Sequence, residues 1–117
     1  YRSDSEDSGK TWRTAYDTGL PNNNSGIDVA VCGGDLYLVM NPTRGAWASR
    51  TPLVIWRSRD NGRSFTPFVT LEDLPLDPES GKPAEFSYPA LVAGEDRLFV
   101  AYTYLRRQIA FAEIPLA

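Results

Sequence analysis

The sequence predicts an all-β chain, part of a β-propeller, and two observations carry this prediction. The first is a motif, Ser-x-Asp-x-Gly-x-(Thr/Ser)-aromatic, that occupies residues 5–12 and recurs at residues 58–65. The two copies begin about fifty residues apart, which is within the range of propeller blade repeats. The second is a series of short apolar runs between turn residues, with no helical periodicity over a helix-sized window. At roughly 40–50 residues a blade, residues 1–117 form a segment of about two blades plus flanking strands.

Each copy of the motif has the composition of a tight hairpin turn. The aspartate (Asp7 or Asp60) is placed to accept hydrogen bonds from the backbone N–H groups just ahead, as in an Asx-turn. The glycine two positions later supplies a residue that adopts positive φ without strain. The aromatic residue that ends each copy (Trp12 or Phe65) is expected to bury its ring and anchor the turn.

Seven short strands are expected in antiparallel meanders. Gly33-Gly34 separates two apolar runs and is a two-residue hairpin signal. Residues 94–97 form a second hairpin turn, and the last strand places Ile109, Phe111 and Glu113 on one face. The expected strands are residues 27–32, 35–40, 53–58, 65–71, 88–93, 98–104 and 108–114.

Three stretches are expected to be loops because they are rich in turn-forming residues. They are residues 21–26, which contain three consecutive asparagines, residues 41–49 and residues 74–84. The last holds Pro75, Pro78 and Pro83, and proline cannot occupy a central strand. This stretch is therefore expected to cross from one sheet to the next.

Composition excludes several kinds of chemistry. With 12 basic and 15 acidic residues the net charge is −3, so the basic stripe typical of nucleic-acid or anionic membrane binding is absent. No apolar run approaches the length of a membrane span. The chain has no histidine, which excludes a Ser-His-Asp triad, a Cys-His dyad and His-ligated zinc. The single Cys32 excludes an intrachain disulfide and a multi-cysteine metal site, and is expected in the core.

No cofactor and no metal are therefore expected, and any catalysis must use carboxylates, Tyr, Arg or Lys. Residue 1 is Tyr, and neither a signal peptide nor a transmembrane segment is visible, so the compartment stays open. The start of the chain has the appearance of a truncation.

The repeated motif is the Asp-box, and the motifs around it keep a recognisable order. After the first box come residues 20–28 and 38–43, then Arg50-Thr51-Pro52-Leu53 ahead of the second box, and then residues 85–91 and 98–109. This order resembles the C-terminal portion of the sialidase (neuraminidase) superfamily, the BNR/Asp-box repeat glycosyl hydrolases. The resemblance implies a six-bladed sialidase-type β-propeller. Residues 1–117 would be a partial propeller, completed by upstream sequence or by another chain.

The same resemblance implies a retaining exo-glycosidase that hydrolyses terminal sialic acid or a related acidic sugar through a tyrosine nucleophile. The chemistry has a physical basis. The anomeric centre of a sialic acid carries a carboxylate, which repels an anionic nucleophile but not a neutral phenol, and sialidases are the tyrosine exception among glycosidases. Arginine binds the substrate carboxylate with two parallel hydrogen bonds, which lysine does not.

Two residues match family positions directly. Tyr88, which opens Tyr-Pro-Ala-Leu, matches the catalytic nucleophile, although most strand tyrosines are structural. Arg50 matches the third arginine of the carboxylate clamp, the alternative being a solvated loop arginine. If both roles hold, the two side chains face one pocket. A purely structural propeller predicts that they lie far apart.

Other polar residues have weaker assignments. Asn24 and Ser25 lie in a loop that approaches the substrate in relatives, with a simple turn as the equal alternative. Glu85 precedes Tyr88 by three residues, and these positions point to opposite faces of an extended strand, so Glu85 is expected to be a structural or rim carboxylate and not the base. Arg106 and Arg107 are expected at the rim or in solvent.

No residue of the chain matches the family's base glutamate, acid/base aspartate or first two clamp arginines, so residues 1–117 alone are expected to be inactive. The alternative function is a non-catalytic Asp-box propeller that binds carbohydrate or serves as a scaffold, because a fold does not fix a function.

Overall fold

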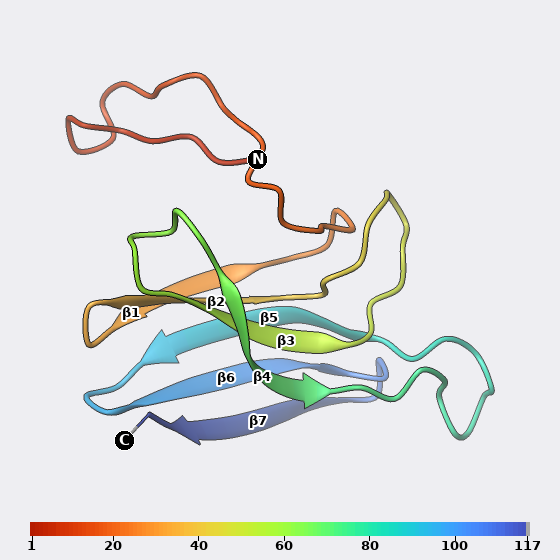
Figure 1. The fold of residues 1–117 in the computed structure, drawn as a ribbon. Helices are drawn as coiled ribbons and strands as arrows, with labels where there is room; N and C mark the ends of the chain where they lie inside the picture. Colours follow the sequence, from red (N-terminus) through yellow and green to blue (C-terminus); the bar gives the residue numbers. More distant parts are fainter. Residues whose placement is uncertain (117) are drawn as a thin grey trace.

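The computed structural model describes residues 1–116, which form seven β-strands and no helix. The strands lie in two antiparallel sheets, one with the order β1-β2-β3-β4 and the other with the order β5-β6-β7 (Figure 1). None of the described segments is a helix of the length and hydrophobicity needed to cross a bilayer. The strands are β1 (Asp28–Cys32), β2 (Asp35–Met40), β3 (Leu53–Ser58), β4 (Thr66–Glu72), β5 (Phe86–Ala93), β6 (Arg97–Tyr104) and β7 (Gln108–Pro115).

The all-β prediction and all seven predicted strands are confirmed. Within each sheet, strands that are consecutive in sequence pair with one another, so each sheet is a meander. The largest boundary difference is at β5, which begins at Phe86, two residues before the predicted start. The register of β5 against β6 shifts between Ser87 and Ala90, because Pro89 has no N–H to donate and Tyr88 has a φ of 52°.

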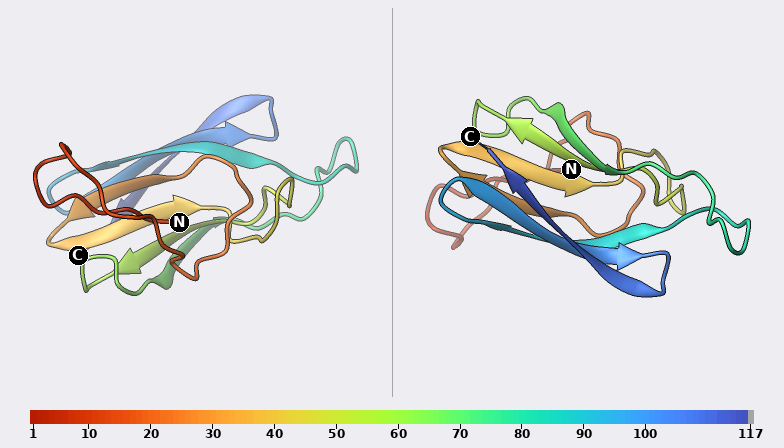
Figure 2. Two further views of the ribbon diagram at one scale, coloured as in Figure 1. Left: turned by 90° about the horizontal axis from the view of Figure 1, so that it is seen from above. Right: turned by 90° about the horizontal axis from the view of Figure 1, so that it is seen from below.

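The hydrophobic core lies between the two sheets, with β1 and β2 against β5 (Figures 1 and 2). The first sheet contributes Tyr37, Val39, Leu53 and Ile55 from alternate positions of β2 and β3. Phe86 is fully buried at the start of β5. The second sheet also supplies Leu91, Leu98, Val100 and Tyr102. Cys32 is buried here as predicted, with its sulfur 3.4 Å from the carbonyl oxygen of Gly94.

The two Asp-boxes have the same hydrogen-bond geometry. In the first, Asp7 accepts hydrogen bonds from the backbone N–H of Thr11 at 2.8 Å and from its hydroxyl at 2.6 Å. In the second, Asp60 accepts the same pair from Ser64 at the same distances. In both, the N–H of the box glycine donates to the first serine at 2.8 Å. The predicted Asx-type turn is therefore confirmed in both copies.

The glycine prediction is also confirmed, since φ is 85° at Gly9 and 80° at Gly62. The residue before each glycine is left-handed as well, with φ of 61° at Ser8 and 59° at Asn61, which the motif alone did not indicate. Two successive positive φ values make a turn whose twist matches that of the flanking strands.

The prediction that Trp12 buries its ring is wrong for the described chain. The side chain is 64% exposed, and its indole N–H donates to the carbonyl oxygen of Gly9 at 3.2 Å. The first box lies on an N-terminal hairpin, closed by a bridge between Arg2 and Tyr16, that projects from the sheets (Figure 1) and contacts the second box through Arg2, whose Nη1 donates to the Asn61 carbonyl at 3.1 Å. The ring therefore has no sheet to pack on, whereas Phe65, immediately before β4, is partly buried.

Candidate functional site

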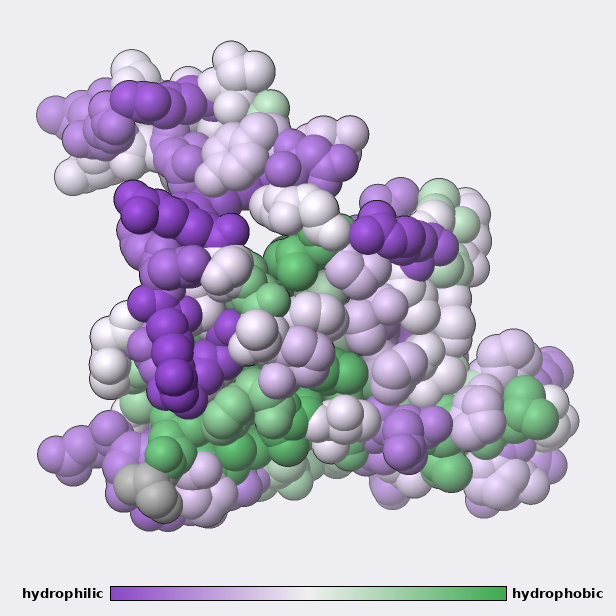
Figure 3. Space-filling model, in the orientation of Figure 1, coloured by the Kyte–Doolittle hydropathy of each residue, from purple (hydrophilic) through white to green (hydrophobic). Residues whose placement is uncertain are grey.

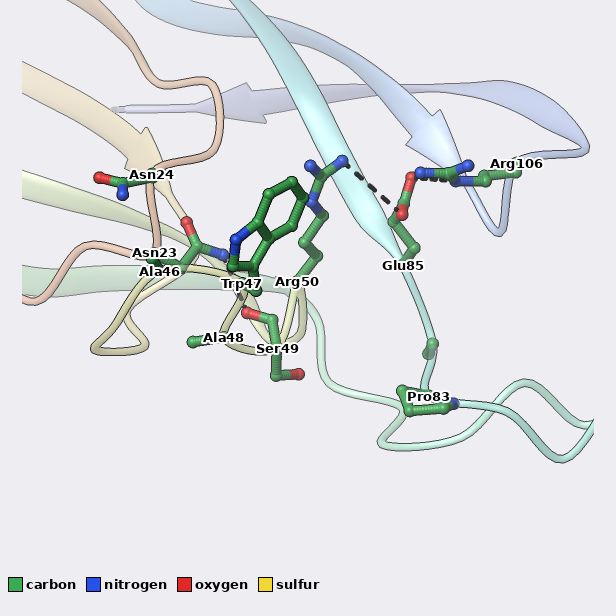
Figure 4. Close-up of a pocket in the computed structure, with 11 residues that line it drawn as sticks. Asn23, Asn24, Ala46, Trp47, Ala48, Ser49, Arg50, Pro83, Glu85 and Arg106 are labelled. Atoms are coloured by element: carbon green, nitrogen blue, oxygen red, sulfur yellow. Dashed lines mark hydrogen bonds and ion pairs between the residues drawn. The ribbon is translucent and has the colours of Figure 1, made fainter.

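A pocket with a volume of about 560 Å³ opens where four connecting segments meet at one end of the sheets (Figure 4). The loop before β1 contributes Asn23 and Asn24, and the loop between β2 and β3 contributes residues 46–50. Residues 83–85, which lead into β5, and Arg106, in the β6–β7 turn, complete the lining. The pocket therefore gathers segments of both sheets that are far apart in sequence.

Arg50 lies beside Tyr88, although Tyr88 is not among the residues that line the pocket. The guanidinium carbon of Arg50 is 5.2 Å from the centre of the Tyr88 ring, within the range of a cation–π contact. Arg50 reaches this position because its backbone is bridged to Glu85, with the N–H of Phe86 donating to the Arg50 carbonyl at 2.9 Å. The far-apart arrangement predicted for a purely structural propeller is absent. The roles of the two side chains stay predictions.

The buried guanidinium nitrogen of Arg50, Nη1, makes no hydrogen bond with any described residue. The nearest carboxylate oxygen, Glu85 Oε1, is 3.7 Å away, which is an ion-pair distance and too long for a hydrogen bond. Buried polar groups are nearly always hydrogen-bonded, whereas this nitrogen has only the ion pair with Glu85. A carboxylate is the acceptor that best fits a guanidinium.

Glu85 lies between two arginines (Figure 4). Its carboxylate accepts hydrogen bonds from Arg106 Nε at 2.9 Å and from the Ser87 hydroxyl at 2.9 Å, in addition to the ion pair with Arg50. Burial alone raises the pKa of Glu85, but the hydrogen bonds from Arg106 and Ser87 and the charges of both arginines bring the pKa below its ordinary value. Glu85 is therefore anionic at neutral pH and forms ion pairs where it lines the pocket, which is compatible with the predicted structural or rim carboxylate.

The expectation that the Glu85 and Tyr88 side chains point to opposite faces of a strand does not apply here, because the strand is irregular. Alternation between strand faces assumes a regular strand, whereas β5 has a register shift between Ser87 and Ala90 and Tyr88 has a left-handed φ of 52°. As a result, Glu85 and Tyr88 both approach Arg50.

Tyr88 is held in an unusual conformation with its side chain exposed. The residue is 62% exposed, while its neighbours Ser87 and Pro89 are buried. Positive φ in a bulky residue is uncommon, and such strain gathers at functional positions. The Cα of Gly26 faces this bend closely enough that an added Cβ would lie 3.6 Å from Tyr88 Cα.

The structure separates the two loop residues predicted to bind substrate. Asn24 is exposed and lines the pocket, with a φ of 61°. Ser25 is absent from the lining, and its hydroxyl lies 2.5 Å from Asn23 Oδ1 and 3.1 Å from Asn41 Oδ1. Ser25 therefore takes part in an internal network rather than facing the pocket.

Sequence reasoning missed Trp47, which lines the pocket near Arg50 and is 96% exposed (Figure 4). It also missed Asn23 and Asn41, which are 4% and 1% exposed and hydrogen-bonded to the segments that carry the site residues. Trp47 could have been found as a large aromatic residue in a loop that otherwise consists mainly of turn-forming and small residues. No such signal marked Asn23 and Asn41, because asparagine is common in loops, where its side chain bonds to nearby backbone groups.

Comparison with protein families gives one result. The model of a family described as BNR repeat-like domain matches residues 1–100. The chain belongs to the BNR repeat-like domain family. Comparisons with curated proteins and with solved structures returned no match. The predicted BNR-repeat resemblance is therefore confirmed at the level of the family.

The pocket of this BNR repeat-like domain is lined by two arginines, a carboxylate, two asparagine amides and one aromatic ring, that of Trp47. No group of three or more acidic, cysteine or histidine residues placed to hold a metal ion occurs in the part of the chain that the structure describes. These groups suit an anionic, polar ligand with an apolar ring face.

Proposed function

We propose that this BNR repeat-like domain is part of a retaining exo-glycosidase that hydrolyses terminal sialic acid or a related acidic sugar, with Tyr88 as the nucleophile. The observation that carries the proposal is the contact between Arg50 and Tyr88, 5.2 Å from guanidinium carbon to ring centre, beside a guanidinium nitrogen that makes no hydrogen bond. A sugar carboxylate bound to Arg50 would bring the attached anomeric carbon towards the phenol.

The proposed reaction has two steps. The Tyr88 oxygen forms a bond to the anomeric carbon while a base takes the phenol proton, and the bond to the aglycone breaks as an acid protonates its oxygen. A water molecule then attacks the glycosyl-tyrosine, which releases the sugar with retained configuration and restores the phenol. Tyr88 is exposed, so both the sugar and the water have access to it.

The proposal needs groups beyond those assigned here. Arg50 is one carboxylate ligand, and Asn24 is placed to contact the sugar at the rim of the same pocket. Glu85 forms ion pairs with Arg50 and Arg106, so we do not assign it as the base. We therefore assign the base, the acid and the remaining clamp arginines to sequence outside residues 1–117 or to another chain. The two meanders would then be about two blades of the six-bladed propeller.

The test is hydrolysis of an aryl sialoside by the full-length protein and its Tyr88→Phe variant. We expect turnover to fall by several orders of magnitude in the variant, because loss of the nucleophile removes the covalent step. Sialoside binding should persist, since Tyr88→Phe keeps the aromatic ring beside Arg50. Unchanged turnover would refute Tyr88 as the nucleophile.

A non-catalytic carbohydrate-binding or scaffold module is the second candidate. It is favoured by the pocket lining, which has Arg50, Arg106 and an exposed Trp47 for binding but no assigned acid or base. In that case the wild-type protein would bind a sialoside with no release of the aryl group, and Tyr88→Phe would leave binding unchanged.

A further inference from the structure

Asn41 connects three segments that each carry a candidate site residue. It lies one residue after β2 and is 1% exposed. Its amide nitrogen donates to the Pro52 carbonyl at 2.9 Å and to the Phe86 carbonyl at 3.0 Å, and its amide oxygen faces the Ser25 hydroxyl at 3.1 Å. Pro52 is two residues from Arg50, Phe86 is two residues from Tyr88, and Ser25 follows Asn24.

We infer that Asn41 is a positioning residue that fixes Arg50 and Tyr88 at their mutual distance in the candidate site. The expected effect of Asn41 on catalysis rests on the proposed function. The positioning itself does not depend on that function, because the Asn41 side chain donates hydrogen bonds both to the segment that carries Arg50 and to the segment that carries Tyr88.

An amide is the side chain that this place requires. Pro52 and Phe86 each present a carbonyl oxygen, so the bridging group must supply two N–H donors. The amide oxygen of Asn41 lies 3.1 Å from the Ser25 hydroxyl, which also contacts Asn23 Oδ1. A carboxylate would place negative charge against two carbonyl oxygens. An apolar side chain would remove the donor that each carbonyl oxygen has in Asn41.

A second asparagine supports the same arrangement from the other side of Arg50. Asn23 is 4% exposed, and its amide nitrogen donates to the Ser49 carbonyl at 2.9 Å, while its oxygen accepts the Ser25 hydroxyl at 2.5 Å. Asn23 and Asn41 thus hold the chain on both sides of Arg50, at Ser49 and at Pro52, and are joined through Ser25. Only Asn41 reaches the strand that carries Tyr88.

The experiment compares two Asn41 variants with a matched control in the full-length protein. Asn41→Leu removes the donors at similar volume. Ser58→Ala is the control, because it removes buried hydrogen bonds at the opposite end of β3, in the second Asp-box. We expect Asn41→Leu to lower kcat/KM for an aryl sialoside on the order of 10²-fold, since small misplacements of reacting groups have effects of this size. Ser58→Ala, at a similar loss of Tm, should leave kcat/KM within about twofold of wild type.

Asn41→Asp gives a readout that general destabilisation does not produce. Burial beside two carbonyl oxygens favours the protonated acid, which donates one hydrogen bond. Activity of this variant relative to wild type should therefore rise as the pH is lowered. It also provides the test if Asn41→Leu does not fold.

The outcomes separate the inference from the proposed function. If the wild type is active and neither Asn41 variant differs from Ser58→Ala, the positioning role is refuted and the proposed function stands. If the wild type is inactive, the proposed function fails, and hydrogen exchange decides the inference. Faster exchange in peptides containing Arg50 and Tyr88 in Asn41→Leu but not in Ser58→Ala supports it, and equal exchange in the two variants overturns it.

Discussion

At the scale of single residues, the site depends on departures from regular strand geometry. Tyr88 was identified from its motif, and Arg50 from its place before the second box, so sequence order was enough to name both. A contact between these two side chains was expected only if both proposed roles hold. The backbone geometry that brings them together could not be predicted from the sequence. The left-handed φ of Tyr88 and the register shift around it are backbone features that a pattern of residue types does not encode.

Arg50→Lys tests the carboxylate-binding role at this scale. Lysine keeps the charge but loses the planar pair of donors, so one charge-assisted hydrogen bond is lost, with an effect of about 1.5–3 kcal/mol. We expect the Kd for a sialoside to rise by roughly 10- to 150-fold in a calorimetric titration of the full-length protein. Arg59→Lys is the control, since Arg59 is exposed at the other end of β3. Equal affinities for the Arg50 and Arg59 variants would contradict the role.

At the scale of elements, the Asp-box was the most predictable part of the molecule. Its aspartate, serine and glycine act within one turn, so the sequence motif contains nearly all of the interactions that form it, and both copies have matching distances. The ring at the end of the motif depends on a neighbouring sheet instead. Trp12 is exposed and Phe65 is partly buried for that reason.

The boxes also predict a pH dependence. Hydrogen bonds from the Thr11 or Ser64 hydroxyl and backbone N–H, and then from the Ser5 or Ser58 hydroxyl, lower the pKa of Asp7 and Asp60 from 3.8 to about 2. The folded protein thus favours the ionised form more than the unfolded chain does. The stabilisation is fully present above pH 3.8 and is lost as the pH falls through about 2.

Thermal unfolding of the full-length protein between pH 2 and 7 checks this dependence. We expect Tm to fall below about pH 4, and the fall to be shallower in Asp60→Asn, which removes one of the two titrating box carboxylates. Asp73→Asn, at an exposed aspartate outside both turns, should follow the wild-type curve. The box assignment fails if Asp60→Asn and Asp73→Asn have the same pH profile.

At the scale of the whole molecule, the described chain is extended and has an uncovered sheet face. Its radius of gyration is 15.0 Å, compared with about 13 Å for a compact domain of this length. The hydrophilic N-terminal hairpin projects from the sheets, while hydrophobic side chains gather over them (Figure 3). One face of the β5–β7 sheet packs on the core, and the other exposes Val92, Ile109 and Phe111 at 63%, 71% and 67%.

This uncovered face is continuous, because the cross-strand pairs of the sheet align its residues. Val92 pairs with Phe99, Ala101 pairs with Phe111 and Thr103 pairs with Ile109, and the rings of Phe99 and Phe111 stack at 6.1 Å. The alternation predicted for the last strand is thereby confirmed. Exposed apolar surface of this kind marks an interface. We therefore propose that a surface outside residues 1–117, from the same protein or from another chain, covers it.

Size-exclusion chromatography and thermal unfolding of residues 1–117 in isolation test this proposal. We expect self-association or a broad, weakly cooperative transition, because the uncovered face and the edge of β7 are free to pair with other copies. Phe111→Glu should reduce association, since it places charge in the middle of the face, whereas Glu95→Lys, a change of charge in the exposed β5–β6 turn, should not. A monomer that unfolds in one sharp transition would show that residues 1–117 are complete without a partner surface. The position of Arg50 and Tyr88 at one end of the two sheets would then define the whole site, and the missing acid and base would favour the binding function over the hydrolase.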